Sequence, residues 1–124
     1  MEDEELVQSY IDWTEQSLTE LSSHHQALSV NPSDTKLQHA IYSIAHNIKG
    51  MGSSFGFPLM TDAGASLCRY IKTLPPRPAN TQVIEAHMKC FEAILTHRIR
   101  GTCHGKGEQL ITRLRTLVDR SLAA

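Results

Sequence analysis

Apolar side chains recur at three- and four-residue steps in five successive stretches of the chain, and no segment shows the two-residue alternation of a strand. Side chains with this spacing share one face of an α-helix, because a helix has about 3.6 residues per turn. The pattern therefore predicts an all-α protein. The expected helices cover residues 3–29, 34–55, 58–74, 80–99 and 107–121.

Helix breakers separate these stretches. Asn31-Pro32 follows the first stretch, Gly56-Phe57-Pro58 the second, and three prolines between residues 75 and 78 the third. Proline lacks a backbone donor and disfavours helical geometry in the residue before it. Short connections favour antiparallel neighbours. We therefore expect one domain over residues 1–124, an antiparallel up-down four-helix bundle with an additional packed C-terminal helix.

Composition narrows the function classes. Of the 124 residues, 40% are hydrophobic, which is enough for a core without metals or cross-links. The formal net charge is -1, so no overall field attracts nucleic acid or anionic lipid. Three cysteines, Cys68, Cys90 and Cys103, cannot all pair, which favours a reducing compartment. The acidic start does not resemble a signal peptide, and no apolar run approaches the ~20 residues of a membrane span. We expect a cytoplasmic monomer that binds neither nucleic acid nor membrane.

The expected helix over residues 34–55 has a narrow apolar face. At about 100° per residue, six apolar side chains fall within roughly 40° of one direction. They are Leu37, Ile41, Ile44, Ile48, Met51 and Phe55. His46 falls about 180° from this face, and Lys49 and Gly50 lie one turn further along its own side. His46 is therefore expected to point to solvent from the middle of a rigid helix.

These three residues suggest phosphoryl chemistry. Near neutral pH a large fraction of exposed imidazole has a free nitrogen lone pair and can act as a nucleophile, and an ammonium group can neutralise phosphoryl oxygens. Glycine inside a helix costs roughly 0.5 to 1 kcal/mol relative to alanine, so Gly50, Gly52 and Gly56 require a reason. Close approach of another molecule and tight helix packing are both possible reasons. An exposed histidine or lysine is also an ordinary surface residue, so the geometry alone leaves the active site open.

The segment from Ala45 to Phe57 reads AHNIKGMGSSFGF. It resembles the signature of histidine phosphotransfer (HPt) domains, which is H-x-x-K-G, four variable residues, an apolar residue and glycine. Its Phe55-Gly56-Phe57 end is similar to the phosphoacceptor domain of chemotaxis histidine kinases. The order, lengths and breakpoints of the helices also agree with the family over most of the chain.

The resemblance implies an HPt-like bundle that carries a phosphoryl group and has no ATP-binding or autokinase activity. His46 would be the phosphoacceptor, exchanging the group with receiver-domain aspartates in a two-component phosphorelay. Lys49 would neutralise the phosphate charge, and Gly50 would allow the partner to approach. The partners would be response-regulator receiver domains or a hybrid histidine kinase. The chain would need no cofactor, because Mg²⁺ is expected in the acidic pocket of the partner receiver domain.

Two positions depart from the family pattern. Family members often place Glu or Gln on the next helix, where it bonds the second ring nitrogen of the histidine. The matching position is Cys68, whose thiol is a weak partner and whose place on the helix also suits a small core residue. Chemotaxis-type domains can carry a further histidine where this chain has Ala65. The sequence therefore does not show which residue, if any, fixes the tautomer of His46.

Five further residues are candidates for the partner-binding surface. His39, Tyr42 and Ser53 lie on the polar side of the helix wheel. Phe57 and Leu59 would join Tyr42 as the apolar part of this surface.

Two alternative functions also remain. The chain could be a stand-alone phosphoacceptor substrate of a separate histidine kinase, or a phosphorylation-independent adaptor that binds a kinase or receiver.

Three other patterns carry no functional prediction. Arg98 and Arg100 are expected to close the fourth helix, where cations complement the helix dipole. The loop over residues 101–107 is one residue short of a phosphate-binding loop, and no strand precedes it. Cys103 and His104 are adjacent, without a second pair at zinc spacing, so we expect no metal.

Overall fold

The computed structural model describes residues 4–101 and 106–123, which form five α-helices, one 3₁₀ turn and no strand. The all-α prediction and the order of the five helices are confirmed. The elements are α1 (Glu4–Val30), α2 (Thr35–Gly52), the 3₁₀ turn η1 (Ser53–Phe55), α3 (Pro58–Lys72), α4 (Thr81–Thr96) and α5 (Lys106–Ala123).

Local sequence signals explain where the helices begin. The Asp34 carboxylate accepts hydrogen bonds from the backbone N–H groups of Lys36 and Leu37, at 2.9 and 3.1 Å, and so caps α2. Asn80 caps α4 in the same way, through the N–H of Gln82 at 3.0 Å. Pro58 occupies the first turn of α3, where its missing N–H costs no helical hydrogen bond.

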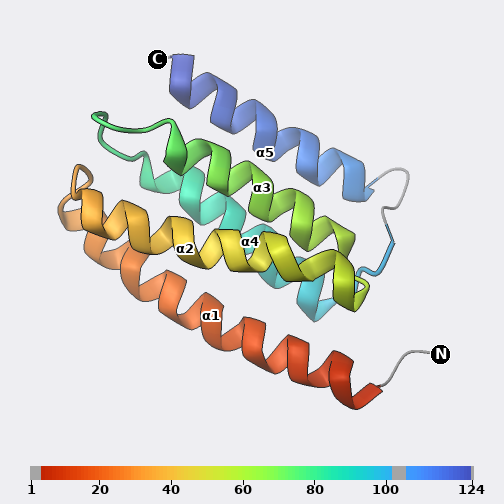
Figure 1. Ribbon diagram of the computed structural model, residues 1–124. Helices are drawn as coiled ribbons and strands as arrows, with labels where there is room; N and C mark the ends of the chain where they lie inside the picture. The colour runs from red at the N-terminus through yellow and green to blue at the C-terminus, as the bar shows by residue number, and fades with distance from the viewer. Residues whose placement is uncertain (1–3, 102–105, 124) are drawn as a thin grey trace.

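The first four helices form an antiparallel bundle, and α5 lies along its outside (Figure 1). Around the bundle, α2 packs against α1 and α3, and α4 packs against α1 and α3 on the other side. The last helix, α5, contacts α3 and α4. Figure 1 thus shows α2 on a side of the bundle that α5 does not cover. This arrangement confirms the expected four-helix bundle with an additional packed C-terminal helix.

Among the described residues, the core is apolar except for a few polar side chains. Its largest fully buried side chains include Tyr70, Phe57, Phe91, Leu21 and Leu28. His87 is also fully buried, with Nδ1 2.8 Å from the Val83 carbonyl and Nε2 2.9 Å from the Ser66 hydroxyl. A carbonyl only accepts, so Nδ1 carries the proton and Nε2 accepts from Ser66. Burial lowers the pKa of His87 to about 4.

Three helices end earlier than expected, and of these α3 ends at Lys72 instead of residue 74. Helix α2 ends at Gly52 and continues as η1, and α4 ends at Thr96, so Arg98 and Arg100 lie beyond it. The prediction that these arginines close α4 is therefore wrong. Arg98 adopts a positive φ of 47° and donates to the Gln8 side chain at 2.8 Å. The chain has turned away from the helix axis, and the arginines bond to other elements.

Cys68 and Cys90 are buried free thiols, and burial raises the pKa of Cys90 to about 11. Cys103 and His104 lie outside the described residues. None of the described helices combines the length and apolar character that crossing a membrane requires.

Candidate functional site

His46 lies on the exposed face of α2, roughly opposite the side that packs into the bundle. Its side chain is exposed, whereas the neighbouring side chains of Ala45 and Ile48 are fully buried. Ile41 and Ile44 lie on the same packed side and are also buried. The apolar face of the helix thus fixes the direction of His46. Among the described residues, none forms a hydrogen bond with either of its ring nitrogens, so a lone pair is available for reaction.

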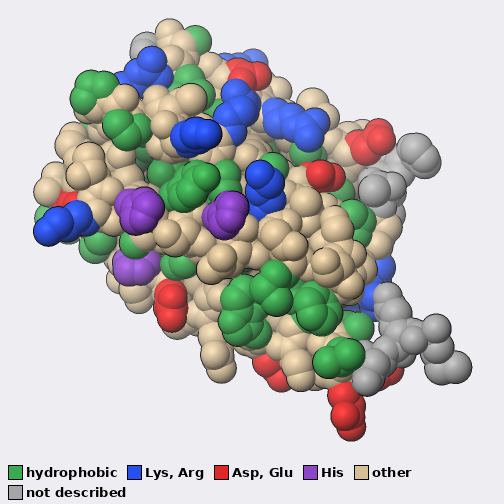
Figure 2. Space-filling view, in the orientation of Figure 1, with side chains coloured by type: hydrophobic (Ala, Val, Ile, Leu, Met, Phe, Trp, Pro, Cys, Tyr) green, Lys and Arg blue, Asp and Glu red, His purple; other side chains and the backbone are tan. Residues whose placement is uncertain are grey.

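Three aromatic rings form a row along this face. Tyr42 stacks on His46 with ring centroids 6.0 Å apart and an interplanar angle of 16°. His39 stacks on the other side of Tyr42 at 6.4 Å and the same angle. His39 is exposed, and Tyr42 is half-buried against the core. Figure 2 shows this side of the molecule, where histidine side chains gather over α2 with hydrophobic surface between them.

Lys49 is exposed one helical turn after His46 and on the same side. The Lys49 ammonium also lies near Cys68 on α3. Burial raises the pKa of the Cys68 thiol, and the positive charge of Lys49 partly opposes this rise. Cys68 is only 6% exposed, and within the described structure no hydrogen bond joins it to His46. A thiol buried in this way acts as a small core group, and no described side chain replaces the expected Glu or Gln.

The three glycines of the signature differ in what surrounds them. A Cβ added to Gly50 would meet no atom within 4 Å, so packing inside the molecule does not require glycine there. A Cβ on Gly52 would lie 2.8 Å from the Phe57 carbonyl oxygen and from the Thr61 backbone nitrogen, so Gly52 permits tight packing. Gly56 adopts a left-handed φ of 85°, which favours glycine. Only Gly50 is left open for an approaching molecule.

The backbone of Lys49 is held by α3. The Thr61 hydroxyl donates to the Lys49 carbonyl at 2.9 Å and accepts from the Ser53 N–H at 2.9 Å. In a regular helix these two backbone groups would bond each other directly. The hydroxyl is therefore inserted into the ladder of α2, which explains why the helix changes to a 3₁₀ turn at Ser53. The Ser53 hydroxyl also bonds Thr61, at 3.1 Å.

Gly64 allows α3 to approach closely at the same point. A Cβ on Gly64 would lie 2.8 Å from the backbone nitrogen of Lys49 and 3.0 Å from its Cα. Thr61 and Gly64 are not among the site residues predicted from the sequence. A glycine in the middle of an amphipathic helix was the one signal that could have indicated this contact.

Two predicted partner-binding residues are not on the surface. Phe57 is fully buried and Leu59 is 2% exposed, so the prediction that they form the apolar part of a docking surface is wrong. The left-handed turn at Gly56 directs Phe57 into the bundle, where it stacks on Tyr10 with centroids 5.5 Å apart. Leu59 starts the core face of α3. Ser53 and His39 are exposed as expected.

Arg100 fastens the chain after η1. Its guanidinium donates to the carbonyls of Gly56 and Phe55, at 3.1 and 3.3 Å, and lies 4.8 Å from the centroid of the Phe57 ring. The carbonyls at the end of the 3₁₀ turn are thereby paired. Arg100 thus stabilises the end of the segment that begins at His46.

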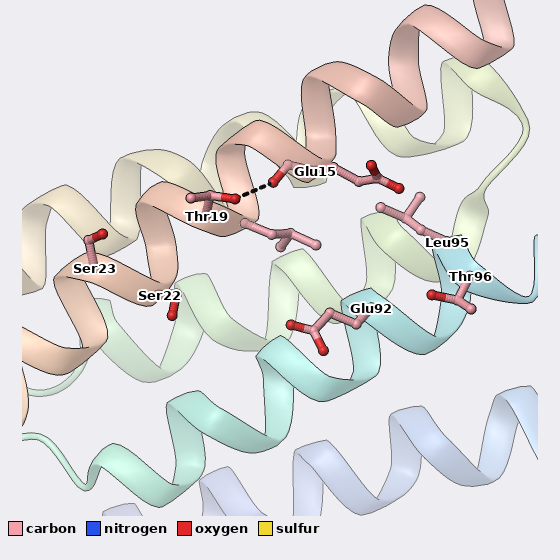
Figure 3. Close-up of a pocket in the computed structure, with 8 residues that line it drawn as sticks. Glu15, Thr19, Ser22, Ser23, Glu92, Leu95 and Thr96 are labelled. Atoms are coloured by element: carbon pink, nitrogen blue, oxygen red, sulfur yellow. Dashed lines mark hydrogen bonds between the residues drawn. The ribbon is translucent and has the colours of Figure 1, made fainter.

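A groove of about 520 Å³ lies between α1 and α4, away from His46. Figure 3 shows Glu15 and Thr19 on its α1 side and Glu92 and Thr96 on its α4 side. Carboxylates repel phosphoryl oxygens. This groove is therefore a poor site for a phosphoryl group, and its size does not make it a competitor to the exposed face of α2.

The site consists of an exposed histidine, a lysine one helical turn further and an open glycine. Their order in the sequence, H-x-x-K-G, is that of a known family. The model of the Hpt domain family matches residues 5–124, which is nearly the whole chain. The chain belongs to the Hpt domain family. No curated protein and no solved structure gives a match. Hpt domains are phosphocarriers of two-component phosphorelays rather than ATP-dependent kinases, and they interact with receiver domains and histidine kinases.

Proposed function

We propose that this Hpt domain accepts a phosphoryl group on His46 from the aspartyl phosphate of one receiver domain and passes it to the aspartate of another. The observation that carries the proposal is the exposed imidazole of His46, whose nitrogens have no hydrogen-bond partner among the described residues. It stands in the middle of a helix that is fixed by a capped start and a buried apolar face.

The chemistry needs little from the carrier itself. A ring nitrogen of His46 forms a bond to phosphorus, the bond between phosphorus and the aspartate oxygen breaks, and the carboxylate leaves with the electron pair. Lys49 would reduce repulsion by neutralising charge on the phosphoryl oxygens. Positioning and charge stabilisation dominate phosphoryl transfer, and the partner with its Mg²⁺ would supply most of both. We propose that the chain acts as a monomer without a cofactor of its own.

Gly50 supports the docking part of the proposal. Nothing inside the molecule fills the space where its Cβ would be, although alanine would favour the helix by roughly 0.5 to 1 kcal/mol. A partner whose surface passes close to the helix backbone beside His46 accounts for this cost.

Labelling from two phosphoryl sources tests the proposal. The chain is incubated with a phosphorylated receiver domain and, separately, with a histidine kinase and ATP. We expect rapid acid-labile label from the receiver domain. Label from the kinase alone would identify a stand-alone phosphoacceptor, and label from neither source would identify an adaptor. His46→Gln should abolish labelling, whereas His97→Gln, at an exposed histidine after α4, should leave it unchanged.

A further inference from the structure

The burial of Phe57 and Leu59 raises the question of which side chains form the apolar part of a docking face around His46. A pocket of about 320 Å³ lies beside the row of rings, between the first half of α2 and the end of α3. His39 and Tyr42 belong both to the row of rings and to the wall of the pocket. The pocket, here called the α2–α3 pocket, is therefore continuous with the surface that surrounds His46.

The pocket has an apolar wall and a basic rim. Ile71 and Pro75 form the side opposite Tyr42. Lys72 is exposed at the rim, and none of the ion pairs among the described residues includes it. Figure 2 shows hydrophobic surface between the histidines over α2 and basic side chains on the α3 side. This combination suits an apolar side chain that is accompanied by a negative charge.

Gln38 also lines the pocket, and its buried amide is held by two carbonyls. Its side chain is only 3% exposed, and its amide nitrogen donates to the carbonyls of Pro32 and Arg77, at 3.0 and 3.4 Å. These two bonds fix the orientation of the amide, because a carbonyl cannot accept from an oxygen. Its Oε1 atom is buried and has no partner among the described residues. A buried polar atom left unpaired costs stability, and such atoms are uncommon in native proteins.

The position of the pocket places it under any partner of ordinary size. His39 is seven residues before His46, which is about 10 Å along the helix axis and on the same face. A standard interface covers about 800 Å² of each partner, and a disc of that area has a radius of about 16 Å. A domain centred on His46 would therefore cover His39 and the pocket beside it.

We propose that the α2–α3 pocket receives an aromatic or branched apolar side chain of the receiver domain that docks on His46. An acidic residue of the receiver lies against Lys72, which is exposed and belongs to no ion pair among the described residues. The α2–α3 pocket, and not Phe57 and Leu59, then forms the apolar part of the docking surface. This inference rests on the proposed function.

Charge reversal at the rim gives the first test. Lys72→Glu is compared with Lys89→Glu, the same change at an exposed residue of α4 that pairs with Glu85 at 3.3 Å. Within the described structure α4 makes no contact with α2. Phosphotransfer from a phosphorylated receiver domain is measured over a range of receiver concentrations. We expect Lys72→Glu to raise the KM about fivefold with little change in kcat, because it weakens docking and not the chemistry. Lys89→Glu should match the unmodified chain. Equal KM values for the two variants would overturn the inference.

A photo-cross-link identifies the occupant. The photoreactive residue p-benzoylphenylalanine replaces Thr35, an exposed residue on the edge of the pocket. Illumination with the receiver domain should link the two proteins through one apolar side chain of the receiver. A link only to a second copy of this chain, or no link while His46 is labelled normally, would overturn the inference. The same experiment in a His46→Gln background needs no phosphoryl transfer, so it separates failure of the pocket from failure of the proposed function.

Discussion

Replacing Gly50 by alanine should stabilise the fold and slow the transfer reaction. A Cβ at Gly50 meets no atom within 4 Å, so the substitution adds no strain. Alanine is more favourable than glycine inside a helix by roughly 0.5 to 1 kcal/mol. Unfolding a protein of 124 residues has an entropy of about 260 cal/mol/K near 60 °C, which converts this gain into a rise in Tm of about 2 to 4 °C. The rise is measured by thermal unfolding followed by circular dichroism.

The effect of the same substitution on transfer should have the opposite sign. A methyl group placed between α2 and a closely docked receiver must be accommodated at the interface, and overpacking of this kind costs about 1 to 3 kcal/mol. We therefore expect kcat/KM for transfer from a phosphorylated receiver to fall at least about fivefold. Unchanged transfer with a raised Tm would show that Gly50 does not serve docking, and a lowered Tm would contradict the open environment.

Gly64→Ala is the matched control, since it makes the same chemical change one helix away. Its new Cβ would lie 2.8 Å from the backbone nitrogen of Lys49, so α2 and α3 must separate. The overpacking cost of about 1 to 3 kcal/mol should exceed the gain in helix propensity. We expect its Tm to fall while that of Gly50→Ala rises. Equal shifts in the two variants would refute the reasoning from the glycine environments.

Two further predictions concern the support of Lys49 and the stability of the core. Thr61→Val should slow phosphotransfer, because it loosens the backbone of Lys49, and Thr61→Ser should restore the rate. When Lys49→Ala is already present, Thr61→Val should have little further effect on the rate. Equal slowing with and without Lys49→Ala would show a general structural effect. For His87, burial holds the pKa at about 4 in the folded chain against 6.5 when unfolded. Folding favours the neutral ring, so the contribution of His87 to the free energy of unfolding is complete above pH 6.5. This contribution falls by about 3 kcal/mol as the pH drops towards 4. Urea unfolding from pH 7 to 4 should show this loss, with a shallower dependence in His87→Gln; parallel curves would contradict it.

The sequence predicted the features that depend on one helix at a time. Apolar periodicity identified five helices, and the helix wheel placed His46 on the exposed side. These predictions succeed because a helix converts spacing in the sequence directly into direction in space. The family signature then supplied the chemical interpretation, which the exposed geometry alone left open.

The predictions that failed depend on contacts between elements. Phe57 and Leu59 follow the left-handed turn at Gly56, and a helix wheel cannot show where the chain goes after such a turn. Gln38 is buried although its residue type is polar, because carbonyls from two loops bond its amide. Thr61 shortens α2 from the neighbouring helix. None of these effects is visible in the residues of a single element.

The most direct test of the proposed function is to find the atom that carries the phosphoryl group. The ¹⁵N-labelled chain is phosphorylated by a receiver domain and observed by correlated ¹H, ¹⁵N and ³¹P NMR at alkaline pH, where phosphohistidine is stable. We predict a nitrogen–phosphorus coupling at one ring nitrogen of His46 and at no other histidine of the chain. A phosphoryl group on a different residue, or a His46 ring that stays unmodified while the receiver loses its phosphate, would contradict the account.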